Sequence, residues 1–159
     1  MPRHASARRE CLHNLIYWRQ GGWLAAGPSA SGHVRVRGGG AEDDGGLAGH
    51  RWKNAPSLGT YLAHGDRGFA PIVDHEPPDA ARAVRERIMT GVRLREGLDP
   101  AGLLRASDQA VPGSGARLER EARGLRDDGL LRLAPERWQV HGRGWLLADW
   151  IARRLMACV

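Results

Sequence analysis

Residues 13–18 read His-Asn-Leu-Ile-Tyr-Trp and bring an imidazole, an amide and two aromatic rings close together, with Cys11 just before them. A Cys-x-His pair could bind iron or zinc, but two ligands do not complete a metal site. An inert thiol is the simpler interpretation of Cys11. For Tyr17 and Trp18 the alternative to ligand contact is packing in a core, around a His13 that is hydrogen-bonded within a strand.

A turn of small residues follows the motif at positions 27–32, Gly-Pro-Ser-Ala-Ser-Gly. Small side chains would let backbone amides approach an anionic ligand closely. A plain loop is the competing interpretation. The other histidines of the chain lack the spacing of metal ligands, so we expect them at the surface or in packing contacts.

The chain has 159 residues and a formal net charge of +6, carried almost entirely by arginine because Lys53 is its single lysine. We attribute this bias to genome composition, so the charge favours nucleic acid only weakly. Four arginines spaced three residues apart, from Arg117 to Arg126, suggest a basic recognition helix. That spacing turns successive side chains around the helix, and neighbouring acids offset their charge. A solvated helix with local ion pairs is predicted instead.

Two cysteines near opposite ends of the chain, Cys11 and Cys158, cannot form the disulfide framework of a secreted domain. The N-terminus has no apolar core of the signal-peptide type. The most apolar run, 145–159, is interrupted by an aspartate and two arginines and does not read as a transmembrane segment. We therefore expect a cytoplasmic protein.

The first half of the chain offers short apolar segments separated by turns. Two apolar runs flank Gly21-Gly22, which is a turn signal, and alternation over 33–37 predicts an exposed strand. The further expectations are a loop over 38–49, a partner strand over 50–54, a short helix over 56–64 and a proline-punctuated linker over 65–78. We place a domain boundary in that linker, between a first unit of residues 1–64 and a second of residues 79–159.

The second half is more regular. Asp79 and Asp99-Pro100 are helix-start signals, and Gly97 and Gly129 suit helix ends. The pattern predicts helices over 80–95, from 99 to about 106, and over 115–128, then a β-hairpin between 130 and 141 and a last helix over 143–157. Three helices, a hairpin and a closing helix form a winged-helix-like order within an α+β chain.

Three blocks carry a family resemblance. Residues 10–18, Glu-Cys-Leu-His-Asn-Leu-Ile-Tyr-Trp, resemble the Glu-Cys-x-His-Asn-Leu-x-Tyr-Trp motif of the radical S-adenosylmethionine (SAM) heme chaperones, the oxygen-independent coproporphyrinogen III oxidase-like proteins. Residues 86–99 resemble the start of that family's C-terminal domain. Residues 125–131 and 138–151 resemble its final hairpin and helix. The order and spacing of the blocks identify the chain as the C-terminal portion of such a protein.

The resemblance implies that the fold begins with a remnant of the last strands of a radical SAM barrel, followed by the winged-helix-like domain. It implies heme binding at His13, Asn14, Tyr17 and Trp18, with His13 on the iron. A turn containing Gly27, Ala30 and Ser31 would face SAM.

The family's [4Fe-4S] cluster is held by a Cys-x-x-x-Cys-x-x-Cys motif, for which this chain lacks the thiolates. We therefore expect no catalytic residues and no radical chemistry from this chain alone. The expected role is heme binding and delivery in porphyrin metabolism, with heme-accepting proteins as partners. The alternative from another class is a cofactor-free winged-helix module that binds nucleic acid or protein.

Overall fold

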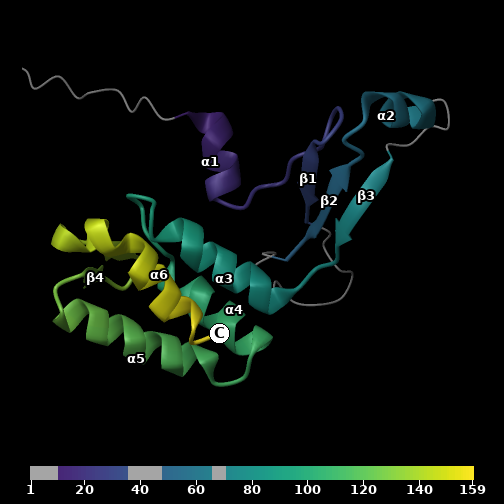
Figure 1. Cartoon of the computed structure of the whole chain (residues 1–159). Coiled ribbons are helices and arrows are strands. Elements are labelled where there is room, and N and C mark those ends of the chain that lie inside the picture. The colour runs from purple at the N-terminus through teal and green to yellow at the C-terminus, as the bar shows by residue number, and fades with distance from the viewer. Residues whose placement is uncertain (1–10, 36–47, 66–70) are drawn as a thin grey trace, which may run out of the picture.

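The computed structural model describes residues 11–35, 48–65 and 71–159 (Figure 1). In chain order the elements are α1 (Leu12–Trp18), β1 (Ser31–Val34), β2 (His50–Asn54), α2 (Leu58–Gly65), β3 (Ile72–Glu76), α3 (Ala80–Gly91), α4 (Pro100–Ala110), α5 (Ser114–Asp127), β4 (Leu131–Leu133), β5 (Trp138–Val140), a 3₁₀ helix η1 (Gly142–Leu147) and α6 (Ala148–Met156). Helices combined with small antiparallel sheets confirm the α+β class. No helix among the described residues is long and apolar enough to cross a membrane.

The N-terminal half contains a three-stranded antiparallel sheet in the order β1-β2-β3. Gly32 lies opposite Trp52 in the register, and a Cβ atom at this glycine would overlap the indole ring. Glycine therefore lets Trp52 lie flat across β1. The outer edge of β3 pairs with no other strand in the described part of the chain, and Ile72 and Val73 are exposed there.

Predictions for this half hold in part. The strand over 50–54 is confirmed, and the helix predicted over 56–64 is α2. The 65–78 stretch, expected to be a linker, contains β3, and the strand predicted over 33–37 begins at Ser31 and ends at Val34. Positions 36–47, most of the predicted loop, lie outside the described residues. The apolar run before Gly21-Gly22 is helical, in α1.

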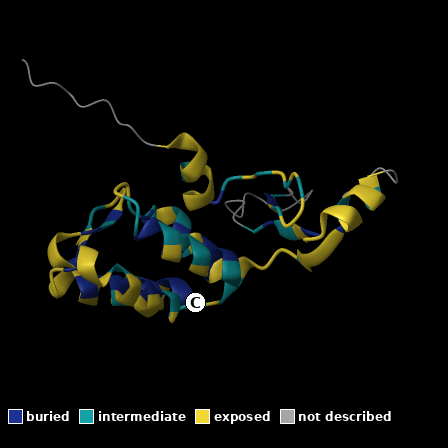
Figure 2. Ribbon diagram, turned by 45° about the horizontal axis from the view of Figure 1, so that its top comes forward, coloured by how far each residue is buried: buried dark blue, intermediate teal, exposed yellow. Residues whose placement is uncertain are grey.

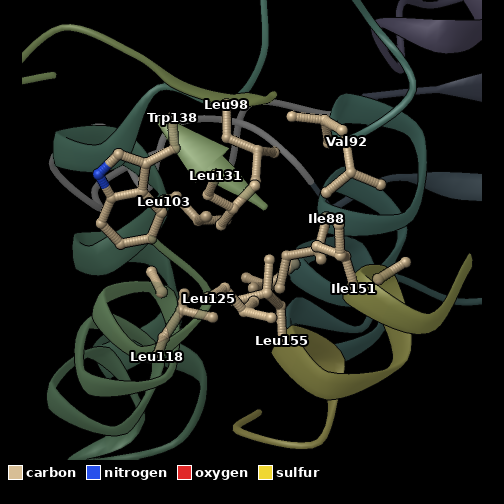
Figure 3. Close-up of a cluster of buried hydrophobic side chains, with 14 of the residues drawn as sticks. Ile88, Val92, Leu98, Leu103, Leu118, Leu125, Leu131, Trp138, Ile151 and Leu155 are labelled. Carbon is tan, nitrogen blue, oxygen red and sulfur yellow. The ribbon is translucent and has the colours of Figure 1, made fainter. Parts of the chain in front are cut away.

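The C-terminal half is built around one apolar core (Figure 3). Helices α3, α4, α5 and α6 and the β4–β5 hairpin contribute to it, and Leu118, Leu125, Ile151 and Leu155 are completely buried. The buried residues gather in this half, whereas α1, α2 and β3 are largely exposed (Figure 2). Burial of apolar side chains therefore stabilises the C-terminal half far more than the N-terminal half.

The helix-start signals predicted at Asp79 and Asp99-Pro100 coincide with the starts of α3 and α4. The Asp79 carboxylate accepts a hydrogen bond of 2.8 Å from the amide of Arg82, which caps α3, and Pro100 occupies the first turn of α4. Two helix ends were predicted wrongly, because α3 ends at Gly91 and α4 continues to Ala110. The final helix begins with a 3₁₀ segment before α6.

Gly97 does not terminate α3, but it has the left-handed backbone that glycine favours, with φ +70°. It leads into Leu98, whose backbone exchanges two hydrogen bonds of 2.8 and 2.9 Å with Trp138. A Cβ atom at Gly97 would overlap the Trp138 carbonyl. This glycine therefore allows the segment after α3 to pair with the hairpin.

Gly97→Ala is expected to destabilise the protein by at least about 1–2 kcal/mol, because alanine disfavours this backbone region and its methyl meets the Trp138 carbonyl. Urea unfolding measures the change. Gly124→Ala is the matched control: Gly124 lies inside α5 with open space around it, so alanine there should stabilise by roughly 0.5–1 kcal/mol. Equal urea midpoints for the two variants would contradict the role given to Gly97 in the pairing of Leu98 with the hairpin.

Candidate functional site

The site is organised by α1, a seven-residue helix that buries none of its own side chains. Contacts just after the helix fix it to the C-terminal half. Arg19 donates two hydrogen bonds, of 2.9 and 2.7 Å, to the Glu96 carboxylate. The Gln20 amide is buried and donates to the Ala83 carbonyl at 3.3 Å. Arg35 donates to the Gln20 carbonyl. So short a helix is held by its connections rather than by its own propensity.

The Arg19–Glu96 ion pair changes the pKa of Glu96. The hydrogen bond from Arg19 lowers the pKa of Glu96 below its usual range, and the charges of Arg19, Arg137 and Arg87 add to this effect. The carboxylate therefore stays ionised to lower pH than a free glutamate. Both side chains remain partly in water, so the pair positions α1 more than it stabilises the fold.

The motif residues form two pairs on α1, each with members four residues apart and therefore on one face of the helix. His13 and Tyr17 form one pair: His13 Nε2 lies 3.2 Å from the Tyr17 hydroxyl, and the rings meet edge to face at 5.0 Å. Asn14 and Trp18 form the other. Trp18 lines a cavity next to α3, which the first pair does not reach. The helix thus presents the four residues in two directions.

Aromatic rings continue inward from His13 and Tyr17. The Tyr17 ring lies 4.7 Å from that of Trp23, and Trp23 lies 4.9 Å from His33. His33 is buried and donates from Nδ1 to the Gly21 carbonyl at 2.9 Å. The series runs from an exposed imidazole to a buried one, and its hydrogen-bonded inner end fixes the position of Trp23.

A cavity of about 410 Å³ opens beside this aromatic series. Tyr17, Trp23 and Trp52 supply aromatic surface, while Arg51, Lys53, Asp74 and Glu76 supply charge. An apolar wall with a few polar groups is the usual composition of a small-molecule site. Among the described residues a second, smaller cavity also adjoins α1.

The exposure of the motif decides between the two interpretations of its aromatic residues. His13 and Asn14 are exposed, and Tyr17 and Trp18 have 40% and 41% of their surface exposed. Packing of Tyr17 and Trp18 in a core is therefore wrong for this structure. Exposed aromatic side chains on a helix with few contacts are surfaces on which a flat ligand can stack.

The small-residue turn uses its backbone groups within the protein. The Gly27 amide donates to the Tyr61 hydroxyl at 3.1 Å, and the buried Asn54 side chain donates to the Gly27 carbonyl at 3.0 Å. The Ala30 amide donates to Gly27, and the Ser31 carbonyl accepts from the Trp23 indole. A SAM-facing role for Gly27, Ala30 and Ser31 stays a prediction.

The described residues hold no group of three or more histidine, cysteine or acidic side chains that could bind a metal ion. Cys11 is exposed just before α1, and Cys158 lies near the end of the chain, where burial raises the pKa of its thiol. The described part of the chain therefore does not fit a [4Fe-4S] cluster, which needs three or four thiolates.

The arginines of α5 are largely occupied by neighbouring groups. Arg123 pairs with Glu119 at 2.7 Å, Arg126 pairs with Asp127 at 2.8 Å, and Arg117 donates to the Cys158 carbonyl. These contacts agree with the predicted helix of local ion pairs. The alternative of a nucleic-acid-binding module receives no support from them.

Sequence reasoning missed several residues of the site. Trp23 and His33 extend the aromatic series, and Arg87 and Arg137 line the cavity beside Trp18. Trp23 was close enough to the motif to be suspected. The two arginines come from distant segments, and no local pattern marks them.

Comparisons with known proteins agree with the family resemblance. The chain is 33% identical over 147 residues to the protein named heme chaperone HemW in Mycobacterium tuberculosis strains CDC 1551 and H37Rv, and the match covers 92% of the chain. The chain spans about a third of the length of these curated relatives, 32% in each case. No family model matches the chain, and no solved structure matches it significantly.

Proposed function

We propose, taking similarity to heme chaperones over 92% of the chain as the premise, that this protein binds heme on α1 and takes part in heme delivery. The observation that carries the proposal is the exposed His13 imidazole, which stands beside Tyr17 at the outer end of an aromatic series. Heme binding in other proteins commonly uses an axial imidazole and flat apolar contacts to the macrocycle.

The residues fit this group. His13 presents a ring to solvent, and its Nε2 is hydrogen-bonded to Tyr17, which holds the ring in one orientation. Heme, when bound, supplies an iron centre that an imidazole nitrogen can ligate. Tyr17 and Trp23 offer a wall for the macrocycle, and the cavity of about 410 Å³ adjoins them. Asn14 lies one turn before Trp18 on α1, and its part in heme binding is proposed from the motif alone.

A hemin titration tests the iron ligand. The intact chain is expected to shift the Soret band of hemin, and His13→Ala should abolish that shift, because the axial nitrogen is lost. Tyr17→Phe should retain ligation but weaken it, since the ring then loses the partner that orients it.

His141→Ala is the matched control, because His141 is also exposed but lies outside both cavities. Its titration should match that of the unaltered chain. An unchanged Soret shift in His13→Ala would remove His13 as the ligand.

We further propose that the chain corresponds to the C-terminal portion of a radical SAM heme chaperone, with residues 1–64 related to barrel strands and residues 79–159 forming a winged-helix-like domain. The chain has two cysteines, too few for the thiolates of a [4Fe-4S] cluster, which supports binding of the cluster outside this chain and no radical chemistry by this chain alone. Heme-accepting proteins as partners, a place in porphyrin metabolism and a cytoplasmic location remain predictions.

A further inference from the structure

The smaller cavity beside α1 differs in chemistry from the larger one. It has a volume of about 160 Å³ and lies where the end of α1 meets α3 and the segment that leads to Leu98. Trp18 from the motif forms one wall, and Arg19, Arg87, Thr90, Glu96 and Arg137 supply its polar groups. Three of these groups are guanidinium ions and one is a carboxylate.

The single glutamate that lines this cavity does not balance its three arginines. Arg19 is bound to Glu96 by two hydrogen bonds. Arg87 and Arg137 have no ion-pair partner within the part of the chain that the structure describes, although both lie near enough to Glu96 for their charges to lower the pKa of that carboxyl. Two cationic groups therefore face the cavity without acidic partners of their own.

The partial burial of Arg35 and its repulsion from Arg87 favour the binding of an anion near Arg87. Arg35 is partly desolvated, and this burial, followed by the charge of Arg87, lowers the pKa of its guanidinium. The charge of Arg87 thus acts both on Arg35 and on Glu96, which Arg19 already binds. An external anion beside Arg87 would relieve this repulsion, and arginine binds carboxylates through two parallel N–H donors.

The size of the cavity and its aromatic wall limit what the anion can be. The volume is below the roughly 300–1,000 Å³ typical of sites that enclose a whole small molecule. It suits the charged arms of a larger ligand rather than a macrocycle. Trp18, with 41% of its surface exposed, offers a flat apolar surface to the ring that carries those arms.

We propose that Arg87 and Arg137 bind the two propionate groups at the edge of the porphyrin, where that edge passes Trp18. This inference rests on the proposed heme function and adds the part of the ligand that the arginines recognise. The two free cations match the two carboxylates, which lie on the same edge of the macrocycle. Trp18 is thereby a contact residue, whereas Arg19 and Glu96 are positioning residues that hold α1 against the cavity.

Metal-free protoporphyrin IX and its dimethyl ester separate carboxylate recognition from iron ligation, because neither contains iron for His13. Binding to the full chain is followed by porphyrin fluorescence. We expect the diacid to bind more tightly than the ester, and Arg87→Ala and Arg137→Ala each to weaken the diacid by about tenfold or more. Neither variant should change binding of the ester.

Arg105→Ala is the matched control, since Arg105 is exposed on α4 and lines neither cavity. Equal affinities for diacid and ester, or arginine variants that bind the diacid as the unaltered chain does, would overturn the carboxylate assignment. If hemin shows no Soret shift but the diacid still binds in a way that depends on the two arginines, only the proposed iron ligation is overturned. The carboxylate assignment then stands. Circular dichroism of each variant checks that the fold is retained.

Discussion

Replacing Leu118 with alanine is expected to lower the free energy of unfolding by about 2–5 kcal/mol. Leu118 lies on α5 with none of its surface exposed, in the cluster that also contains Leu125, Ile151 and Leu155. Shortening the side chain removes buried apolar surface and leaves a cavity that the surrounding helices cannot fully close. Because this cluster is the main apolar core, a loss of that size is a large part of the total stability.

Urea unfolding followed by far-ultraviolet circular dichroism measures the loss. Leu146→Ala is the matched control, because Leu146 is 89% exposed and its replacement should change stability by no more than about 0.5 kcal/mol. Equal destabilisation in the two leucine variants would show that the core is not where the structure places it.

Glu86→Ala is expected to release the N-terminal sheet from the C-terminal half while the C-terminal core stays folded. Glu86 on α3 accepts hydrogen bonds from both terminal nitrogens of Arg51 on β2, one of them 2.6 Å long. It also accepts a bond of 3.4 Å from the Gln20 side chain. Hydrogen bonds to charged groups are worth about 1.5–3 kcal/mol each, so the loss should be large for a unit with few buried apolar contacts.

Hydrogen exchange read by mass spectrometry resolves the two halves. Peptides covering β1 and β2 should exchange faster by about tenfold or more, since an opening free energy lowered by 1.4 kcal/mol gives a tenfold change. Peptides from α5 should be unaffected. Glu119→Ala is the control, because its pair with Arg123 is exposed and lies within one helix. Acceleration of α5 and the sheet together would mean that Glu86 stabilises the whole chain rather than the junction.

Apolar periodicity predicted the C-terminal half well, because its helices bury one face each and begin at recognisable signals. Asp79 caps α3 as expected. The end of α3 was misplaced because Val92 and Leu94 continue the apolar pattern, whereas Gly97 is required for the pairing of Leu98 with the hairpin. That pairing joins residues far apart in the sequence and leaves no local signal.

The N-terminal half was harder to predict for a related reason. β3 was missed because prolines flank it and three of its five residues, Asp74 to Glu76, are polar. An exposed strand of this kind is specified by its neighbour β2 rather than by its own pattern. Likewise, α1 depends on Arg19 and Gln20 contacting α3 and the segment after it, so its helical state follows from tertiary contacts.

The motif could be found from the sequence, but its geometry could not. The family resemblance placed His13, Asn14, Tyr17 and Trp18 in one group, whereas the helix divides them between two faces. That division assigns Tyr17 to one cavity and Trp18 to the other. The arginines of the second cavity are recognised from the folded chain because they converge from separate elements.

The outer edge of β3 has a practical consequence for handling this protein. Its amide and carbonyl groups pair with no other strand in the part of the chain that the structure describes. Together with the apolar side chains of Ile72 and Val73, they form a template on which another extended chain can add. Two copies meeting edge to edge would continue the sheet across the contact, and further copies could propagate it. Concentrated samples of the isolated chain are therefore prone to self-association that begins at this strand.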